Sequence, residues 1–127
     1  MPTITNIPQA ARGTIVRRFR VGPYTAHLEK NLRVQRGPVR YEYILAAIDR
    51  RIRQITFFVT SELNTANETL GGGSHFLCMF IDNDHVNFGA SDDWADLEMF
   101  EAAAVKLIKQ VIAREKQNPP SQPAAGA

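Results

Sequence analysis

The chain has 127 residues, a length typical of one domain, and its 44% hydrophobic and 22% charged residues are ordinary for a globular protein. No apolar stretch approaches the roughly 18 residues that indicate a membrane-spanning helix, and the single cysteine excludes an internal disulfide bond. The first residues lack the basic and apolar regions of a secretory signal, so we expect a soluble, cytoplasmic protein without membrane partners.

The net charge of +2 conceals an uneven distribution of charged residues. Residues 1–60 carry 11 Lys or Arg and 3 Asp or Glu, whereas residues 61–127 carry 4 and 10. Such a split is one signature of an anion-binding surface. A fold that packs the acidic part against the basic part would cancel the two fields, and this is the simpler interpretation.

In chain order, residues 1–12 contain prolines without a clear period, so we expect an extended or loose segment before a single domain at 13–116. Residues 13–21 predict a strand with a mostly apolar odd-numbered face that Arg17 interrupts. Gly22-Pro23 predicts a turn. Residues 24–34 show the cleanest period-two alternation in the chain and predict a half-buried strand.

The segment 39–53 fits both secondary structures, because its apolar residues lie on one stripe of a helix and also on one face of a strand. We predict a strand, since β-branched and aromatic residues follow Pro38 and no N-cap residue precedes the segment. A turn at 49–51 then leads into a second β-rich run at 55–60, which completes a hairpin.

Residues 62–74 include three consecutive glycines and predict a long connection. Strands are expected at 75–82 and 85–89, joined by a two-residue loop. Capping residues, early acidic residues and apolar residues at helical spacing predict one helix from about Asp92 to Arg114. The Pro- and Ala-rich residues 117–127 are expected to be disordered.

These elements predict an α+β fold, in which a curved antiparallel sheet of about six strands, mostly a meander, is packed by one long C-terminal helix. The runs at 55–60 and 75–82 are apolar on both faces, yet one helix covers only one face of a sheet. We expect a homodimer to cover the other face. Curvature of the sheet around its own core, the N-terminal segment or an apolar ligand are the alternatives.

The proposed hairpin places Asp82 opposite His85, and these two are the candidate catalytic residues, because a carboxylate can orient an imidazole as a general base. A cross-strand ion pair at a turn is the simpler interpretation. With this pairing His85 would lie about 13 Å along the strand from Cys78, at roughly 3.3 Å per residue, too far to activate its thiol. We therefore expect Cys78 to be a buried core residue.

The acidic residues between 82 and 93 do not fit the spacing of a calcium-binding loop, so we expect neither a metal site nor a cofactor. The candidate ligand-binding residues are Arg17, Arg40, Glu62 and His75. We expect a small-molecule site, if the chain has one, between the sheet and the 62–74 loop.

The expected function is that of a small binding or interaction module that associates with itself. One alternative is a small enzyme that uses Asp82 and His85, with a nearby arginine for an anionic substrate. Another is nucleic-acid binding by the arginine-rich strands. It is disfavoured because most of the neighbouring rings are assigned to the core face. No motif in the chain is specific enough to indicate a protein family.

Overall fold

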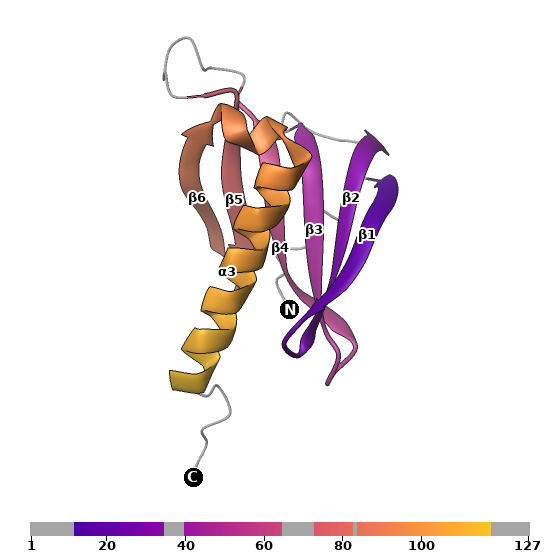
Figure 1. Ribbon diagram of the computed structural model, residues 1–127, viewed down its shortest axis with the longest axis vertical. Coiled ribbons are helices and arrows are strands. Elements are labelled where there is room, and N and C mark those ends of the chain that lie inside the picture. The colour runs from indigo at the N-terminus through magenta and orange to yellow at the C-terminus, as the bar shows by residue number, and fades with distance from the viewer. Residues whose placement is uncertain (1–11, 35–39, 65–72, 83, 118–127) are drawn as a thin grey trace.

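The computed structural model describes residues 12–34, 40–64, 73–82 and 84–117. Six strands form one antiparallel sheet, in which each strand pairs with its neighbour in the sequence (Figure 1). A short 3₁₀ helix, η1, then leads into the long helix α3, and the described sheet does not close into a barrel. The predicted α+β meander with one C-terminal helix is therefore confirmed. The elements are β1 (Arg12–Val21), β2 (Tyr24–Val34), β3 (Tyr41–Asp49), β4 (Gln54–Leu63), β5 (His75–Ile81), β6 (Asp84–Ser91), η1 (Asp92–Ala95) and α3 (Leu97–Gln117).

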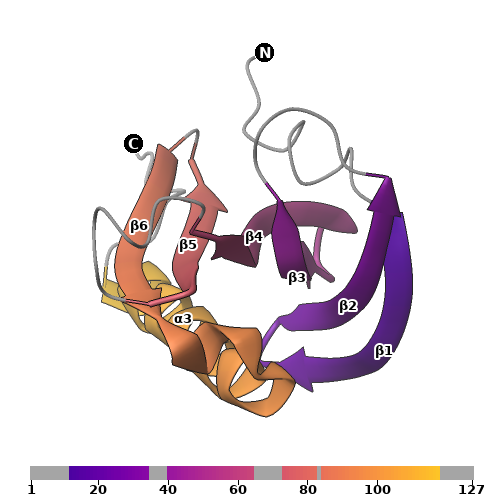
Figure 2. The ribbon, with the colours of Figure 1, turned by 90° about the horizontal axis from the view of Figure 1, so that it is seen from above.

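The sheet curves around α3, which lies against one of its faces (Figure 2). Six flat strands about 4.8 Å apart would span roughly 24 Å, more than twice the about 10 Å diameter of a helix. The core beneath α3 nevertheless includes Val21 from β1 and Met79 from β5. Curvature thus allows strands from both sides of the sheet to contact the same helix.

The main core lies between the sheet and α3, and its apolar side chains alternate along the strands as the sequence predicts. The predicted helical stripe is buried from Phe100 to Val111, while Leu97 is partly buried against the same core. The largest fully buried apolar members are Tyr24, Leu28, Leu45, Phe57, Val59, Phe100 and Ile108.

The second face of the sheet carries a smaller apolar cluster. Its buried members are Tyr41, Ile44, Ala46, Phe58 and Phe80. Each is at most 6% exposed within a single chain. The two-faced apolar character of the central strands is therefore present, but these side chains are already buried and do not themselves require a second copy.

The segment that fits both a strand and a helix is the strand β3, and the chosen interpretation is confirmed. In β1, a bulge between Ile15 and Arg17 shifts the alternation. Val16 consequently packs on the main core and Ile15 is exposed, which corrects the predicted odd-numbered face.

The helix predicted from about Asp92 begins there as a 3₁₀ turn, but it is not continuous. Ser91 caps η1 by accepting a hydrogen bond from Asp93 N. The chain then becomes extended at Asp96, and α3 begins at Leu97 and ends at Gln117. Two successive capping residues thus divide the predicted helix in two.

Several predicted connections either have different bounds in the structure or lie mostly outside the described residues. Strand β4 continues to Leu63, so the connection begins later than the predicted residue 62, and most of it lies outside the described residues. The expected loose N-terminal segment and disordered tail also lie outside the described residues, except for Arg12, which belongs to β1, and Gln117, which belongs to α3. Among the described residues, neither helix has the length and apolar character needed to cross a bilayer.

Candidate functional site

The β5–β6 hairpin does not pair Asp82 with His85, and this prediction is wrong. Strand pairing joins Ile81 to Asp84 and Phe80 to His85, one residue earlier on each strand than predicted. Asp82 occupies the turn with a φ of 54°. Its carboxylate lies 3.9 Å from the guanidinium group of Arg114 in α3, and both side chains are exposed. The two candidate catalytic residues are thus not partners.

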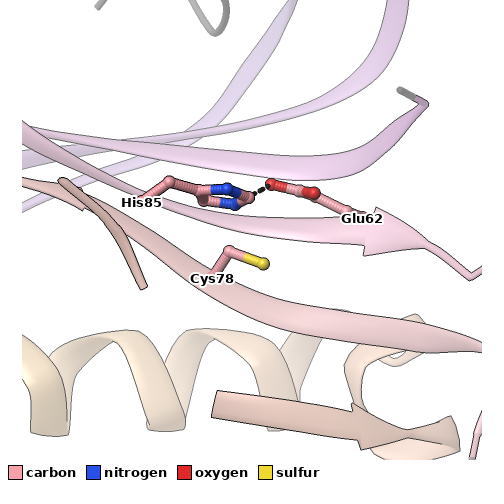
Figure 3. Close-up of side chains that lie close together, drawn as sticks. All are labelled: Glu62, Cys78 and His85. Atoms are coloured by element: carbon pink, nitrogen blue, oxygen red, sulfur yellow. Dashed lines mark hydrogen bonds and ion pairs between the residues drawn. The ribbon is translucent and has the colours of Figure 1, made fainter. Parts of the chain in front are cut away.

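The observed register instead places His85 on the second face of the sheet, beside Glu62 and Cys78. In β4 and β5 the even-numbered residues share this face, and Thr60 pairs directly with Cys78. His85 Nε2 lies 3.3 Å from Glu62 Oε2, as the dashed line in Figure 3 marks. The carboxylate oxygen, the sulfur and the imidazole nitrogen all lie within 4.8 Å of one another. The estimate that His85 lies far from Cys78 is therefore wrong as well.

We call Glu62, Cys78 and His85 the cross-strand triad, because they come from β4, β5 and β6. Its members differ in exposure: the side chain of Glu62 is 9% exposed and that of His85 is 48% exposed. Cys78 is fully buried. The triad thus reaches from the interior of the sheet to solvent, with the imidazole as its outer member.

Neighbouring side chains hold the triad in place. Thr60 Oγ1 donates a hydrogen bond of 3.0 Å to Glu62 Oε2, the same oxygen that His85 approaches. The His85 ring stacks on Phe80, with the ring centroids 4.4 Å apart and the planes 13° from parallel. A hydroxyl therefore orients the carboxylate, and an aromatic ring orients the imidazole.

The buried carboxylate also affects the groups around it. The pKa of the Cys78 thiol is raised above its ordinary value, first by burial and then by the charge and hydrogen bond of Glu62. Burial, followed by the charges of Glu62 and Cys78, likewise raises the pKa of the Tyr41 hydroxyl. A buried thiol of this kind is protonated and unreactive, so the site does not favour thiol catalysis.

The other candidate ligand-binding residues make contacts away from the cross-strand triad. Arg17 Nε is 3.3 Å from the carboxylate of Glu101, an ion pair that joins the basic strand β1 to an acidic residue of α3. Arg40 is exposed, and its backbone carbonyl accepts a hydrogen bond from Leu63 N.

His75 is buried at the start of β5 and contacts its neighbours through both ring nitrogens. Nε2 lies 3.3 Å from Glu42 Oε1, and Nδ1 lies 2.8 Å from Ser74 Oγ. Of the four predicted ligand-binding residues, only Glu62 belongs to the cross-strand triad.

The sequence names Glu62 and His85 as candidates but does not identify Cys78 as their neighbour. One signal is present in β4, where the polar residues Thr60 and Glu62 share a face with the apolar Phe58. Polar side chains on a buried face require partners, and this could have directed attention to the opposite strand. The partners themselves depend on the register of three strands.

Comparisons of the chain with protein-family models, curated proteins and solved structures find no match. Function is therefore inferred from the geometry and chemistry of the site.

Proposed function

We propose that the protein is a small metal-binding module that holds a zinc ion at the cross-strand triad. The observation that supports this proposal is the convergence of one oxygen, one sulfur and one nitrogen ligand within 4.8 Å. Calcium and magnesium prefer oxygen ligands alone, whereas zinc accepts cysteine, histidine and carboxylate together. The mixed ligand set thus favours zinc, and it replaces the expectation that the chain has no metal site.

The distances are compatible with small movements of the side chains. Bonds of about 2.0–2.3 Å in a tetrahedral zinc site leave the ligand atoms roughly 3.3–3.6 Å apart. Glu62 and His85 already have this separation, at 3.3 Å. A shift of about 1 Å would bring the farthest pair of ligand atoms into range.

Zinc would also change the chemistry of the buried groups. A thiol loses its proton when it binds the ion, and the positive charge offsets both the thiolate and the Glu62 carboxylate. Thr60 would keep the carboxylate oriented, as outer-shell partners do at metal sites. Three protein ligands leave a fourth position for water or a small ligand on the side of the exposed His85.

The proposal is tested by titrating the purified, metal-free chain with zinc in a calorimeter. We expect one ion per chain, and we expect Cys78→Ser and His85→Ala each to weaken binding by about tenfold or more. His27→Ala is the matched control, since it removes a histidine of β2 that lies outside the triad. Circular dichroism establishes that each variant is folded.

A second readout identifies the ligands. Cobalt(II) in place of zinc should give a sulfur-to-metal charge-transfer band that Cys78→Ser abolishes and His27→Ala preserves. If the wild-type chain binds neither metal, or if His27→Ala weakens binding as strongly as His85→Ala, the proposed function is wrong.

A further inference from the structure

An apolar groove runs between the edge strand β6 and helix α3. Two hollows share Phe88, Leu107 and Gln110 and so form one continuous depression. Its exposed apolar residues are Val86, Phe88 and Met99, which are 38%, 46% and 47% exposed. The described residues contain six large hydrophobic side chains with such exposure, and half of them belong to this groove or its border. Its lining residues come mainly from β5, β6, η1 and α3, which Figure 1 labels or shows next to one another.

The two sides of the groove carry opposite charges. On the strand side, Asp84 lines the groove together with Asp82, whose carboxylate is 3.9 Å from Arg114 of the same chain. On the helix side, Arg114 lines the groove near Asp84, and Lys106 lines it near Phe88. All four charged side chains are exposed.

We propose that this groove is the interface of a homodimer, whose two-fold axis runs along the groove. Rotation about such an axis places β6 of each chain against α3 of the other. Asp84 then faces the partner's Arg114, and the two apolar surfaces cover one another. An axis across the groove would instead place acidic side against acidic side, which like-charge repulsion disfavours.

The charge pattern favours a second copy over an unrelated partner. A two-fold interface must be complementary to itself, and this surface carries both the negative side and the positive side that such a contact requires. An apolar patch that a dimer covers also accounts for large hydrophobic side chains that would otherwise lie in water.

The interface does not depend on the proposed zinc site. Side chains alternate along β6, so His85 points to the second face of the sheet while Val86 and Phe88 line the groove. The dimer should therefore persist in the presence of a chelator, and failure of either proposal leaves the other intact.

Sedimentation equilibrium of the full chain over a wide range of concentration tests the dimer. We expect the wild-type chain to dimerise. Asp84→Lys, and separately the double variant Lys106→Glu with Arg114→Glu, should each weaken dimerisation by about tenfold or more, because the first places a cation opposite the partner's Arg114 and the second places a carboxylate opposite the partner's Asp84. Glu29→Lys, the matched charge change in β2, should not.

Mixing the two charge-reversed variants provides the decisive measurement. In the mixture, the lysine at position 84 of one variant faces the glutamate at position 114 of the other, and Asp84 of the second variant faces Arg114 of the first. The mixture should therefore form a heterodimer although each protein alone is largely monomeric. A wild-type chain that stays monomeric at the highest concentration overturns the proposal, and so does a mixture that shows no heterodimer. If the groove binds only a small apolar ligand or an unrelated protein, the wild-type chain would stay monomeric.

Discussion

Asp49, the last residue of β3, shows how a single residue stabilises the turn between β3 and β4. Its carboxylate accepts hydrogen bonds from Arg51 Nε at 2.9 Å and Arg51 Nη2 at 2.7 Å, and it also accepts the Arg51 backbone N–H. These bonds, the side-chain bond first among them, lower the pKa of Asp49 although burial opposes the shift. The ionised carboxylate is thus favoured by the folded state.

This arrangement predicts a loss of stability in acid. Because the pKa of Asp49 is lower in the folded chain than in the unfolded chain, its contribution is complete above the unfolded value of about 3.9. It is lost as pH falls through the folded pKa. We expect Asp49→Asn to lower the free energy of unfolding by about 1 kcal/mol at neutral pH, since the exposed Arg51 limits the strength of the pair.

Urea unfolding at a series of pH values measures this effect. The difference between wild type and Asp49→Asn should shrink as the solution becomes more acidic than the folded pKa. A difference that remained constant to the lowest pH would show that the stabilisation does not come from the charge of Asp49.

At the scale of elements, the start of α3 depends on Asp96. Its Oδ2 accepts a hydrogen bond of 3.0 Å from Met99 N, and its backbone carbonyl accepts the Phe100 N–H. The first contact satisfies a donor that has no partner within the first turn, and the second is the first backbone hydrogen bond of the helix. They also fix the point at which the chain turns from η1 onto the sheet.

We expect Asp96→Ala to lower the free energy of unfolding by about 1 kcal/mol, the usual cost of losing an N-cap. Asp93→Ala is the control, because it removes the same charge from η1 without removing the cap of α3. Chemical denaturation of both variants compares them. Equal losses would attribute the effect to charge near the helix and not to the cap.

At the scale of the whole molecule, two adjacent phenylalanines test the two sides of the sheet. Phe57 belongs to the core beneath α3 and is fully buried, whereas Phe58 belongs to the cluster on the second face and is 3% exposed. We expect Phe57→Ala and Phe58→Ala each to cost about 3–5 kcal/mol. The cost should not vary with protein concentration, because both side chains are buried within one chain.

Denaturation at low and high protein concentration measures the two costs. A loss for Phe58→Ala that appears only at high concentration would mean that a second copy buries this face, as the sequence suggests. The expected dimer would then lie on the second face of the sheet and not along the β6–α3 groove.

Much of this architecture could be predicted because its signals are local. The alternation at 24–34 and the Gly22-Pro23 turn give the bounds of β2, and the spacing of Phe100, Ala104 and Ile108 gives the buried stripe of α3. These patterns follow from the periods of strands and helices. The local sequence therefore predicts the six strands, their order and the long C-terminal helix, but not the separate η1.

The cross-strand triad could not be predicted in the same way. It requires the registers of three strands at once, and a shift of one residue moves every side chain to the opposite face. The register of β6 depends on which two residues form the loop, and the positive φ of Asp82 is not evident from its identity alone. Glu62 and His85 could thus be named as separate candidates, but their proximity could not.

The meander also affects how the chain folds. Each strand pairs with its neighbour in the sequence, so the sheet can form progressively while the protein is being synthesised. Helix α3, however, follows all six strands in the sequence, and it supplies the cover of the main core. Until the ribosome has released this helix, the aromatic rings of Tyr24 and Phe57 face water, and the nascent sheet is at its most vulnerable to aggregation.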